Sequence, residues 1–191
     1  MLAEEVSDRD YWETRVTLHR AIDGGVDILR AFSCDIELDT VDEDASAYLS
    51  GWIGWNVAAE DIADAADAIS TDASGLGVVA AEIRDSYPDH WIDSVLLIDR
   101  IFLHESMRGK RLTRLLVEEV VAFFRLDPHS TAITLQPEPQ AKSGGPLPDG
   151  AERDLALARL QYAYMSSGLA PWNGSPIWWR PFPPYDLEGL Q

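Results

Sequence analysis

The sequence predicts an α+β fold, an α/β domain in the broad sense, in which a mixed, mostly antiparallel central sheet is flanked by helices. Residues 13–58 contain three strand-like segments, and in the second of them apolar and polar side chains alternate with the period of two that is typical of strands. An apolar run at 95–105 has the length of a buried strand. Three later segments have apolar residues at helical spacing: 58–86, 112–124 and 152–167. At 191 residues, the chain has the length of one domain.

The composition is strongly acidic, with 33 acidic and 15 basic residues and a formal net charge of -18. Such a field repels nucleic-acid phosphates and anionic membranes and attracts cations, so we expect neither a nucleic-acid nor a membrane partner. The acidity is equally compatible with a salt-rich or compositionally biased source. The 46% hydrophobic content, with seven Trp, excludes a disordered acidic tail.

The cysteine content and the start of the chain bear on its compartment. Cys34 is the single cysteine, so it forms no internal disulfide, and we expect a small core residue. The opening residues MLAEEVSDRD lack a basic start and an apolar run, and no stretch reaches the roughly 18 to 20 apolar residues of a membrane span. We therefore expect a soluble, cytoplasmic protein.

The first part of the chain is expected to form an antiparallel meander. Two strand-like segments, 13–22 and 27–39, are joined by the turn Asp23-Gly24-Gly25. The third, 47–57, is rich in aromatic and β-branched residues. In the second, one set of alternating residues forms a buried face: Phe32, Cys34, Ile36 and Leu38.

The segment 58–86 is expected to form two helices, with a break at Ser74-Gly75. The first has an apolar face and an opposite acidic face. Because the acidic side chains are scattered and no histidine accompanies them, a solvated surface is expected rather than a metal site. These residues are Glu60, Asp61, Asp64 and Asp67.

The second half should alternate strands and helices. The strand at 95–105 is expected to be buried on both faces, although Asp99 and Arg100 interrupt it. A helix through Phe124 and a strand at 131–136 follow. After a Pro- and Gly-rich loop, a helix at 152–167 ends at Gly168, and an aromatic hairpin turns at Asn173-Gly174.

Four basic residues, Arg108, Lys110, Arg111 and Arg114, fall within the sequence RGKRLTR at the start of the predicted helix. Unpaired N–H groups and the helix dipole make such a start a phosphate-binding device, which basic side chains complete. Helix dipoles favour acidic residues in a first turn, so the cations call for an anionic partner. That partner is either a phosphate ligand or the acidic surface of the chain itself.

The stretch IFLHESMRGKRLTRLLVEEV resembles the central strand, pyrophosphate loop and following helix of the GNAT superfamily of acyl-coenzyme A-dependent N-acyltransferases. Arg108, Gly109 and Leu112 match the loop, whereas Arg111 and Thr113 stand where its two glycines usually are. Those glycines let backbone amides approach a pyrophosphate closely. The resemblance implies a GNAT-like domain over 1–191, with a variable half at 1–94 and an acyl-CoA-binding half at 95–182.

The resemblance also implies which residues bind acetyl-CoA, the expected co-substrate. Backbone groups of three strand residues would pair with the pantetheine arm as an added strand does. The loop from Gly109 to Arg114 would bind the pyrophosphate. The implied residues are Ile101, Phe102, Leu103, Arg108, Gly109, Lys110, Arg111, Leu112, Thr113 and Arg114.

Two catalytic candidates follow. Tyr164, in the spacing Tyr164-Met165-Ser166-Ser167-Gly168-Leu169, matches a family motif, which makes it the general acid for the departing thiol; a packing tyrosine is the alternative. Asp99 is our first choice of general base, followed by Glu105 and His104, and a structural pairing of Asp99 with Arg100 or another cation is its alternative.

The expected reaction moves an acetyl group from acetyl-CoA to an amine acceptor. The negative field of the chain would attract a cationic acceptor such as a polyamine, an aminosugar or a peptide amine. Trp-rich segments could line an acceptor pocket, with core packing or a homodimer interface as the other uses. A catalytically inactive GNAT-like binding or regulatory protein is the rival interpretation, favoured by the replaced glycines. A mimic of DNA charge is a third, which the basic residues at 108–114 oppose.

Overall fold

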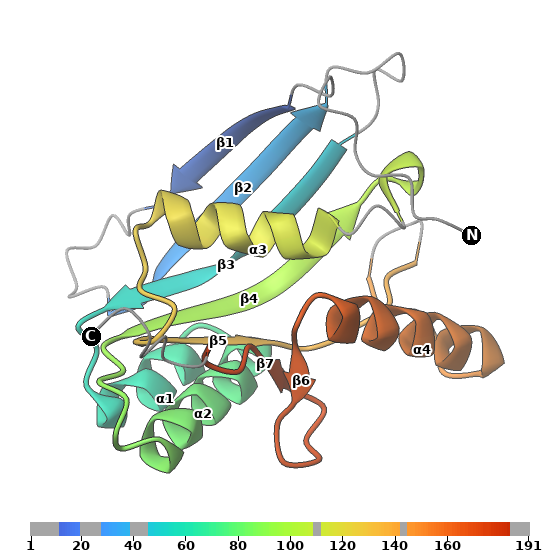
Figure 1. Ribbon diagram of the computed structural model, residues 1–191. Coiled ribbons are helices and arrows are strands. Elements are labelled where there is room, and N and C mark those ends of the chain that lie inside the picture. The colour runs from blue at the N-terminus through green and yellow to red at the C-terminus, as the bar shows by residue number, and fades with distance from the viewer. Residues whose placement is uncertain (1–11, 20–27, 39–45, 109–111, 142–144, 184–191) are drawn as a thin grey trace, which may run out of the picture.

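The computed structural model describes residues 12–19, 28–38, 46–108, 112–141 and 145–183. One seven-stranded sheet has the order β1-β2-β3-β4-β5-β7-β6. Its strands pair antiparallel except β4 and β5, which are parallel. The predicted α+β architecture, a mixed and mostly antiparallel sheet with helices beside it, is therefore confirmed (Figure 1).

The predicted meander forms the first half of the sheet. It consists of β1 (Trp12–Leu18), β2 (Arg30–Leu38) and β3 (Ser46–Trp55). Cys34 pairs with Leu49, and both side chains are fully buried, as period-two alternation with one inward face requires. The predicted turn Asp23-Gly24-Gly25 lies outside the described residues.

Two helices follow the meander, α1 (Ala59–Asp67) and α2 (Thr71–Ser86). The predicted break at Ser74-Gly75 is wrong, because the chain breaks instead at residues 68–70. There the Ser70 hydroxyl accepts a hydrogen bond from the Ala73 N–H at 3.1 Å and caps α2. The four acidic residues predicted to face solvent from α1 are exposed.

Gly77, in the interior of α2, has a packing role that the apolar spacing of the sequence did not reveal. A β-carbon at Gly77 would overlap the β-carbon of Ala66 in α1. Small residues at this contact let the two helices approach each other closely. Gly77 is therefore part of a helix–helix contact and not a helix break.

The second half follows the predicted alternation of strands and helices. Its elements are β4 (Ser94–Leu103), the short 3-10 turn Glu105–Met107, α3 (Leu112–Phe123), β5 (Thr131–Leu135), α4 (Ala151–Ser166), β6 (Ala170–Pro171) and β7 (Trp178–Trp179). β6 and β7 form the predicted closing hairpin, and β7 pairs with β5. The helices α1 and α2 follow β3, which is the order that the sequence predicts.

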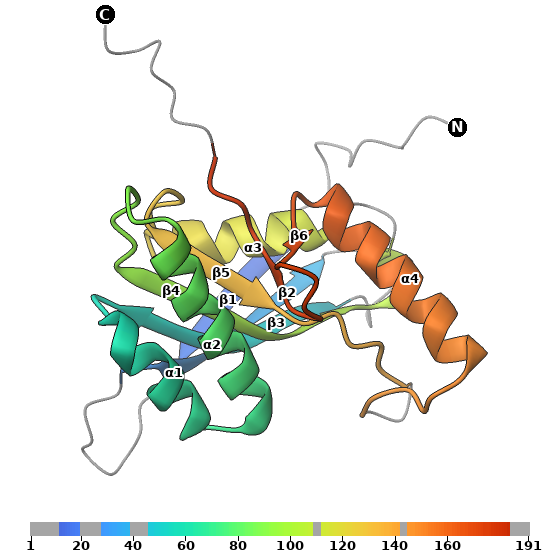
Figure 2. The same ribbon diagram turned by 90° about the horizontal axis from the view of Figure 1, so that it is seen from below.

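The sheet separates two layers of apolar packing. Side chains of α3, together with Tyr164 of α4, pack against one face, and side chains of α1 and α2 pack against the other. The views in Figures 1 and 2 show α3 and the α1–α2 pair on opposite faces. The closing strand contributes to both layers, since Trp178 faces the α3 side and Trp179 the α2 side.

The aromatic closing segment is part of the core. Trp172, Trp178 and Trp179 are buried, and the Trp172 indole N–H donates a hydrogen bond to Glu82 at 2.8 Å. Core packing is thus the use of these tryptophans that the structure shows. In the part of the chain that the structure describes, no helix combines the length and apolarity needed to cross a membrane.

Candidate functional site

The middle of β4 contains a bulge at the charged residues that interrupt its apolar run. Ser50 of β3 pairs with Arg100, but the next residue, Gly51, pairs with Ile98, so Asp99 is the extra residue. Burial changes at the same place: residues 94–98 are buried and Asp99 and Arg100 are exposed. The prediction that this strand is buried on both faces therefore holds only for its first half.

β4 and β5 separate just beyond the bulge. Their parallel pairing runs from Ser94–Thr131 to Ile98–Leu135 and extends no further among the described residues. Residues Ile101, Phe102 and Leu103 still pair with β3 on their other side. The backbone edge of these three residues that faces away from β3 therefore has no strand partner in the described part of the chain, as a site for an added extended ligand requires.

The Asp99 carboxyl lies in surroundings that disfavour its charge. Burial is the main cause that raises its pKa, the nearby Asp72 at the start of α2 raises it further, and Arg100 lowers it. Part of the side chain still reaches solvent. No ion pair within 4.0 Å joins Asp99 to a cation among the described residues, so the expected structural pairing with Arg100 is limited to a longer-range attraction.

The turn after β4 is held by short-range hydrogen bonds. His104 Nδ1 lies 2.8 Å from the Ser106 hydroxyl and caps the short 3-10 turn. The Arg108 Nε–H donates to the Leu103 carbonyl oxygen at 3.1 Å, so its guanidinium is directed back toward the strand. Glu105 is exposed. Gly109, Lys110 and Arg111 lie outside the described residues.

The first turn of α3 places its predicted residues on different sides. Leu112 and Thr113 are buried, so the threonine that replaces a loop glycine directs its side chain inward. Arg114 is exposed and forms an ion pair of 2.7 Å with Glu118, one turn later. For Arg114, therefore, the chain itself supplies an anionic partner, and exposed pairs of this kind are worth only about 0–1 kcal/mol.

Tyr164 is a core residue of the α3 side of the sheet. It is only 4% exposed, and its ring lies 6.4 Å from that of Trp178 in an edge-to-face arrangement. Burial raises the pKa of its hydroxyl well above the ordinary value, so the phenol stays protonated at neutral pH. The packing role is shown, and the same burial makes the phenol a weaker acid than an ordinary tyrosine.

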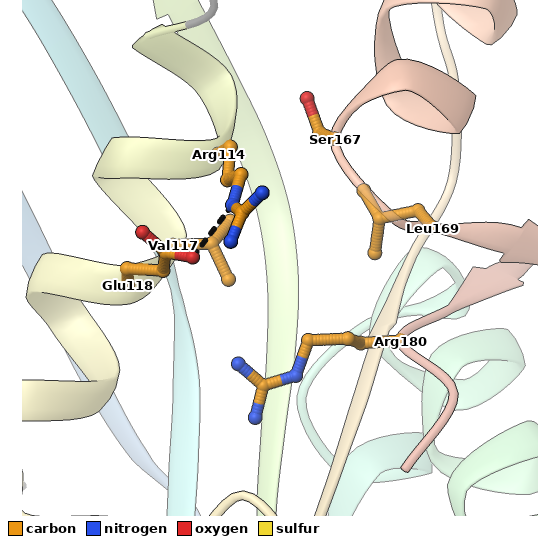
Figure 3. A pocket seen from close by; sticks show the side chains of 6 residues that line it. All are labelled: Arg114, Val117, Glu118, Ser167, Leu169 and Arg180. Atoms are coloured by element: carbon orange, nitrogen blue, oxygen red, sulfur yellow. Dashed lines mark hydrogen bonds and ion pairs between the residues drawn. The ribbon is translucent and has the colours of Figure 1, made fainter. Parts of the chain in front are cut away.

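A small pocket lies between α3 and the turn that follows α4 (Figure 3). Its water-accessible space of about 30 Å³ has room for one or two water molecules. It brings together Arg114 and the end of the Tyr164 motif, two parts of the predicted site that are far apart in sequence. Its lining residues are Arg114, Val117, Glu118, Ser167, Leu169 and Arg180.

Arg180, which the sequence reasoning missed, extends into this pocket toward α3 (Figure 3). Its Nη2 is buried without a hydrogen-bond partner among the described residues. Burial lowers the pKa of Arg180, and the Glu118 carboxylate partly opposes that shift. In the sequence, Arg180 could be noticed only as a lone arginine after the aromatic pair Trp178-Trp179. The direction of its side chain depends on the pairing of β7 with β5.

The two predicted catalytic residues lie on different sides of the sheet. Tyr164 packs in the layer that contains α3, whereas Asp99 is close enough to Asp72 of α2 to be repelled by it. They are therefore not direct partners.

Within the described residues, no group of three or more His, Cys, Asp or Glu side chains is arranged to hold a metal ion. Comparisons of the chain with models of protein families, with curated proteins and with solved structures found no match.

Proposed function

We propose that this chain is an N-acyltransferase that moves an acetyl group from acetyl-CoA to an amine acceptor. The observation that carries the proposal is the separation of β4 from β5 immediately after the bulge at Asp99. It leaves the edge of Ile101 to Leu103 without a strand partner among the described residues, and the Arg108 side chain bonds to the Leu103 carbonyl oxygen there. An extended, amide-containing arm such as pantetheine can pair with such an edge.

The residues around this edge fit an acyl-CoA in charge and placement. Arg108 is exposed just after the 3-10 turn that follows β4, and Arg114 is exposed in the first turn of α3, where the helix dipole also favours an anion. Both guanidinium groups now bond to the chain itself, Arg108 to a carbonyl and Arg114 to Glu118. Each exchanges that bond for a phosphate oxygen when the ligand binds.

The reaction needs a group that removes a proton and a group that supplies one. The thioester of acetyl-CoA supplies an activated acetyl carbonyl; the amine nitrogen forms the new C–N bond as the C–S bond breaks. Asp99 accepts the proton of the attacking amine, and its raised pKa makes it a better base than an ordinary aspartate. Tyr164 is the proposed proton donor to the departing sulfur, and its raised pKa makes it a weaker acid than an ordinary tyrosine.

The α2 side of the sheet, where the proposed base Asp99 lies, carries negative charge near the place where β4 and β5 separate. Asp99 and Asp72 lie near one another there, and the whole chain has a net charge of -18. Two neighbouring carboxylates favour a cationic ligand. We therefore propose a cationic amine as the acceptor class.

A catalytically inactive, GNAT-like binding protein is the second candidate function. The observation that favours it is the loss of both loop glycines, which are Arg111 and Thr113 in this chain. In that case the chain would bind an acyl-CoA or a related anion without releasing thiol.

A thermal-shift titration with acetyl-CoA followed by a thiol-release assay with a panel of amines tests both candidates. A ligand at 100 times its Kd stabilises the folded state by about 2.7 kcal/mol, which gives a clear rise in the unfolding midpoint. We expect this rise in the wild type and a smaller one in Arg114→Gln. Arg30→Gln, which changes an exposed arginine of β2, is the matched control and should behave as the wild type.

The combinations of outcome separate the candidates. A shift with thiol release that depends on an amine supports the enzyme. A shift without release for any amine supports the binding protein, and no shift at millimolar acetyl-CoA contradicts both.

A further inference from the structure

Helix α4 is apolar on two opposite faces. The inner face packs on the body of the protein through the buried Tyr164 and the half-buried Leu160. The outer face exposes Leu155 by 54%, Tyr162 by 71% and Met165 by 60%. Contiguous apolar side chains that face solvent are typical of protein–protein contact surfaces, so the outer face calls for a partner.

The outer residues form one continuous stripe. With about 100° of rotation per residue, they lie within a band of about 80° on the side of the helix opposite Tyr164. Their spacing of three and four residues is that of the a and d positions of a coiled-coil seam. The stripe consists of Ala151, Leu155, Ala158, Tyr162 and Met165, all of which are exposed.

The position of α4 leaves this stripe accessible. Figures 1 and 2 show the C-terminal end of α4 joining β6 while its N-terminal end extends away from the sheet. Only the inner side is tied to the preceding loop, through the ion pair of Arg153 with Glu138 at 3.2 Å. No described element covers the outer side.

Charges beside the stripe match a second, antiparallel copy of the same helix. Glu152 and Arg159 are exposed on the same flank, and neither forms an ion pair with another described residue. In an antiparallel pair with a twofold axis near Ala156, Glu152 faces the partner's Arg159, and Arg159 faces the partner's Glu152. Large residues then face small ones, since Tyr162 lies over the partner's Ala151 and Leu155 over the partner's Ala158.

We infer that the outer stripe of α4 is a self-association surface, through which two copies of this chain form an antiparallel, twofold-symmetric helix pair. A single pair of 16-residue helices lies at the small end of specific interfaces. The dimer is therefore weak, with a Kd in the range of about 10 µM to 1 mM. The inference is independent of the proposed acyl transfer, since it uses none of the residues of that site.

Sedimentation velocity of the full chain tests the surface directly. The average mass of the wild type should rise toward that of a dimer as its concentration increases through the expected Kd range. Leu155→Glu with Tyr162→Glu should remain monomeric at every concentration, because it places charges in the seam. Val78→Glu, an equivalent change at an exposed apolar residue of α2, is the matched control and should dimerise as the wild type.

Charge reversal tests the antiparallel register. Glu152→Arg alone places arginine opposite arginine, and Arg159→Glu alone places glutamate opposite glutamate, so each variant should dimerise more weakly than the wild type. A mixture of the two should form heterodimers, since every flanking pair is then complementary. The chain with both substitutions should regain the wild-type association.

Unfolding midpoints of all variants, measured at a concentration where the wild type is monomeric, confirm that each is folded. A monomeric wild type throughout the concentration range overturns the inference, as does a stripe variant that dimerises normally. Dimerisation without recovery in the mixture overturns the antiparallel register.

Discussion

Gly51 of β3 lies against Leu97 of β4 so closely that a β-carbon on Gly51 would overlap the Leu97 carbonyl oxygen. This contact is next to the bulge that makes Asp99 the extra residue of β4. The two backbones can approach in this way only where one residue has no side chain. The close contact of Gly51 with Leu97 therefore adjoins the bulge that positions Asp99.

Gly51→Ala should therefore destabilise the fold. The new methyl group meets backbone rather than a flexible side chain, so the free energy of unfolding should fall by about 1–3 kcal/mol or more. Denaturant unfolding measures the change. Ser46→Ala, at an exposed position of the same strand, is the control and should stay within about 0.5 kcal/mol of the wild type. Equal stability of Gly51→Ala and wild type would contradict the close approach.

Two glycines of α2 should respond to alanine with opposite signs. At Gly75 the nearest atom to a new β-carbon is Ile177 Cδ1 at 3.4 Å, so Gly75→Ala should stabilise the helix by about 0.5–1 kcal/mol. At Gly77 the β-carbon would meet Ala66, so Gly77→Ala should destabilise by about 1–3 kcal/mol. The two midpoints of urea unfolding serve as each other's control. Shifts of the same sign would show that the α1–α2 contact is looser than described.

In the proposed reaction, the pH dependence should report the surroundings of Asp99. The base acts when deprotonated, so activity falls as the pH drops below its raised pKa. Asp99→Asn should lower kcat/KM for the amine by about 100-fold or more and leave acetyl-CoA binding intact. Asp72→Asn removes a repulsion that raises the pKa of Asp99, so the fall in activity at acidic pH should move to lower pH. Arg100→Gln removes an attraction that lowers this pKa, so the fall should move to higher pH. If the acidic side of the pH–activity profile does not move in these directions, Asp99 is excluded as the base.

The Cys34 thiol should be unreactive in the folded protein. It is fully buried, and burial raises its pKa from 9.0 to about 11, with smaller contributions from Asp35 and Glu119. At pH 8 a disulfide reagent should modify no thiol before unfolding and one after it. Rapid modification of the native chain would contradict the burial.

The same shift also predicts a loss of stability in alkali. The folded state holds the Cys34 thiol proton more tightly than the unfolded state. The contribution of this proton to the free energy of unfolding is therefore complete below pH 9.0 and declines as the pH rises toward about 11. The full difference is about 2–3 kcal/mol. Cys34→Ala should lack this decline, and the difference between the two stability curves separates it from the titration of other groups.

Local patterns predicted the elements well because strands and helices repeat over two to four residues. The alternation around Cys34 identified the inward face of β2, and the apolar spacing after Leu112 identified α3. The helix break was misplaced because Ser74-Gly75 resembles a helix breaker locally, whereas Gly75 lies inside α2. The cap at Ser70 was a readable signal, since serine is a preferred N-cap residue.

The candidate site was less predictable, because its geometry comes from pairing between distant segments. The charged residues in β4 were visible in the sequence, but the bulge at Asp99 appears only in the register of β4 against β3. In the sequence, Arg180 is one residue of an aromatic terminal segment. The pairing of β7 with β5 brings its side chain into the pocket that Arg114 and Glu118 also line.

The sequence by itself determined the order of the elements, their inward faces and the presence of a basic helix start, because each is encoded by side chains a few residues apart. Only the tertiary structure decided that β4 and β5 run parallel and then separate, that Tyr164 and Asp99 lie on different sides of the sheet, and that α4 leaves an apolar stripe exposed. These features depend on which distant surfaces pack together, and periodicity within one segment carries no information about its partner.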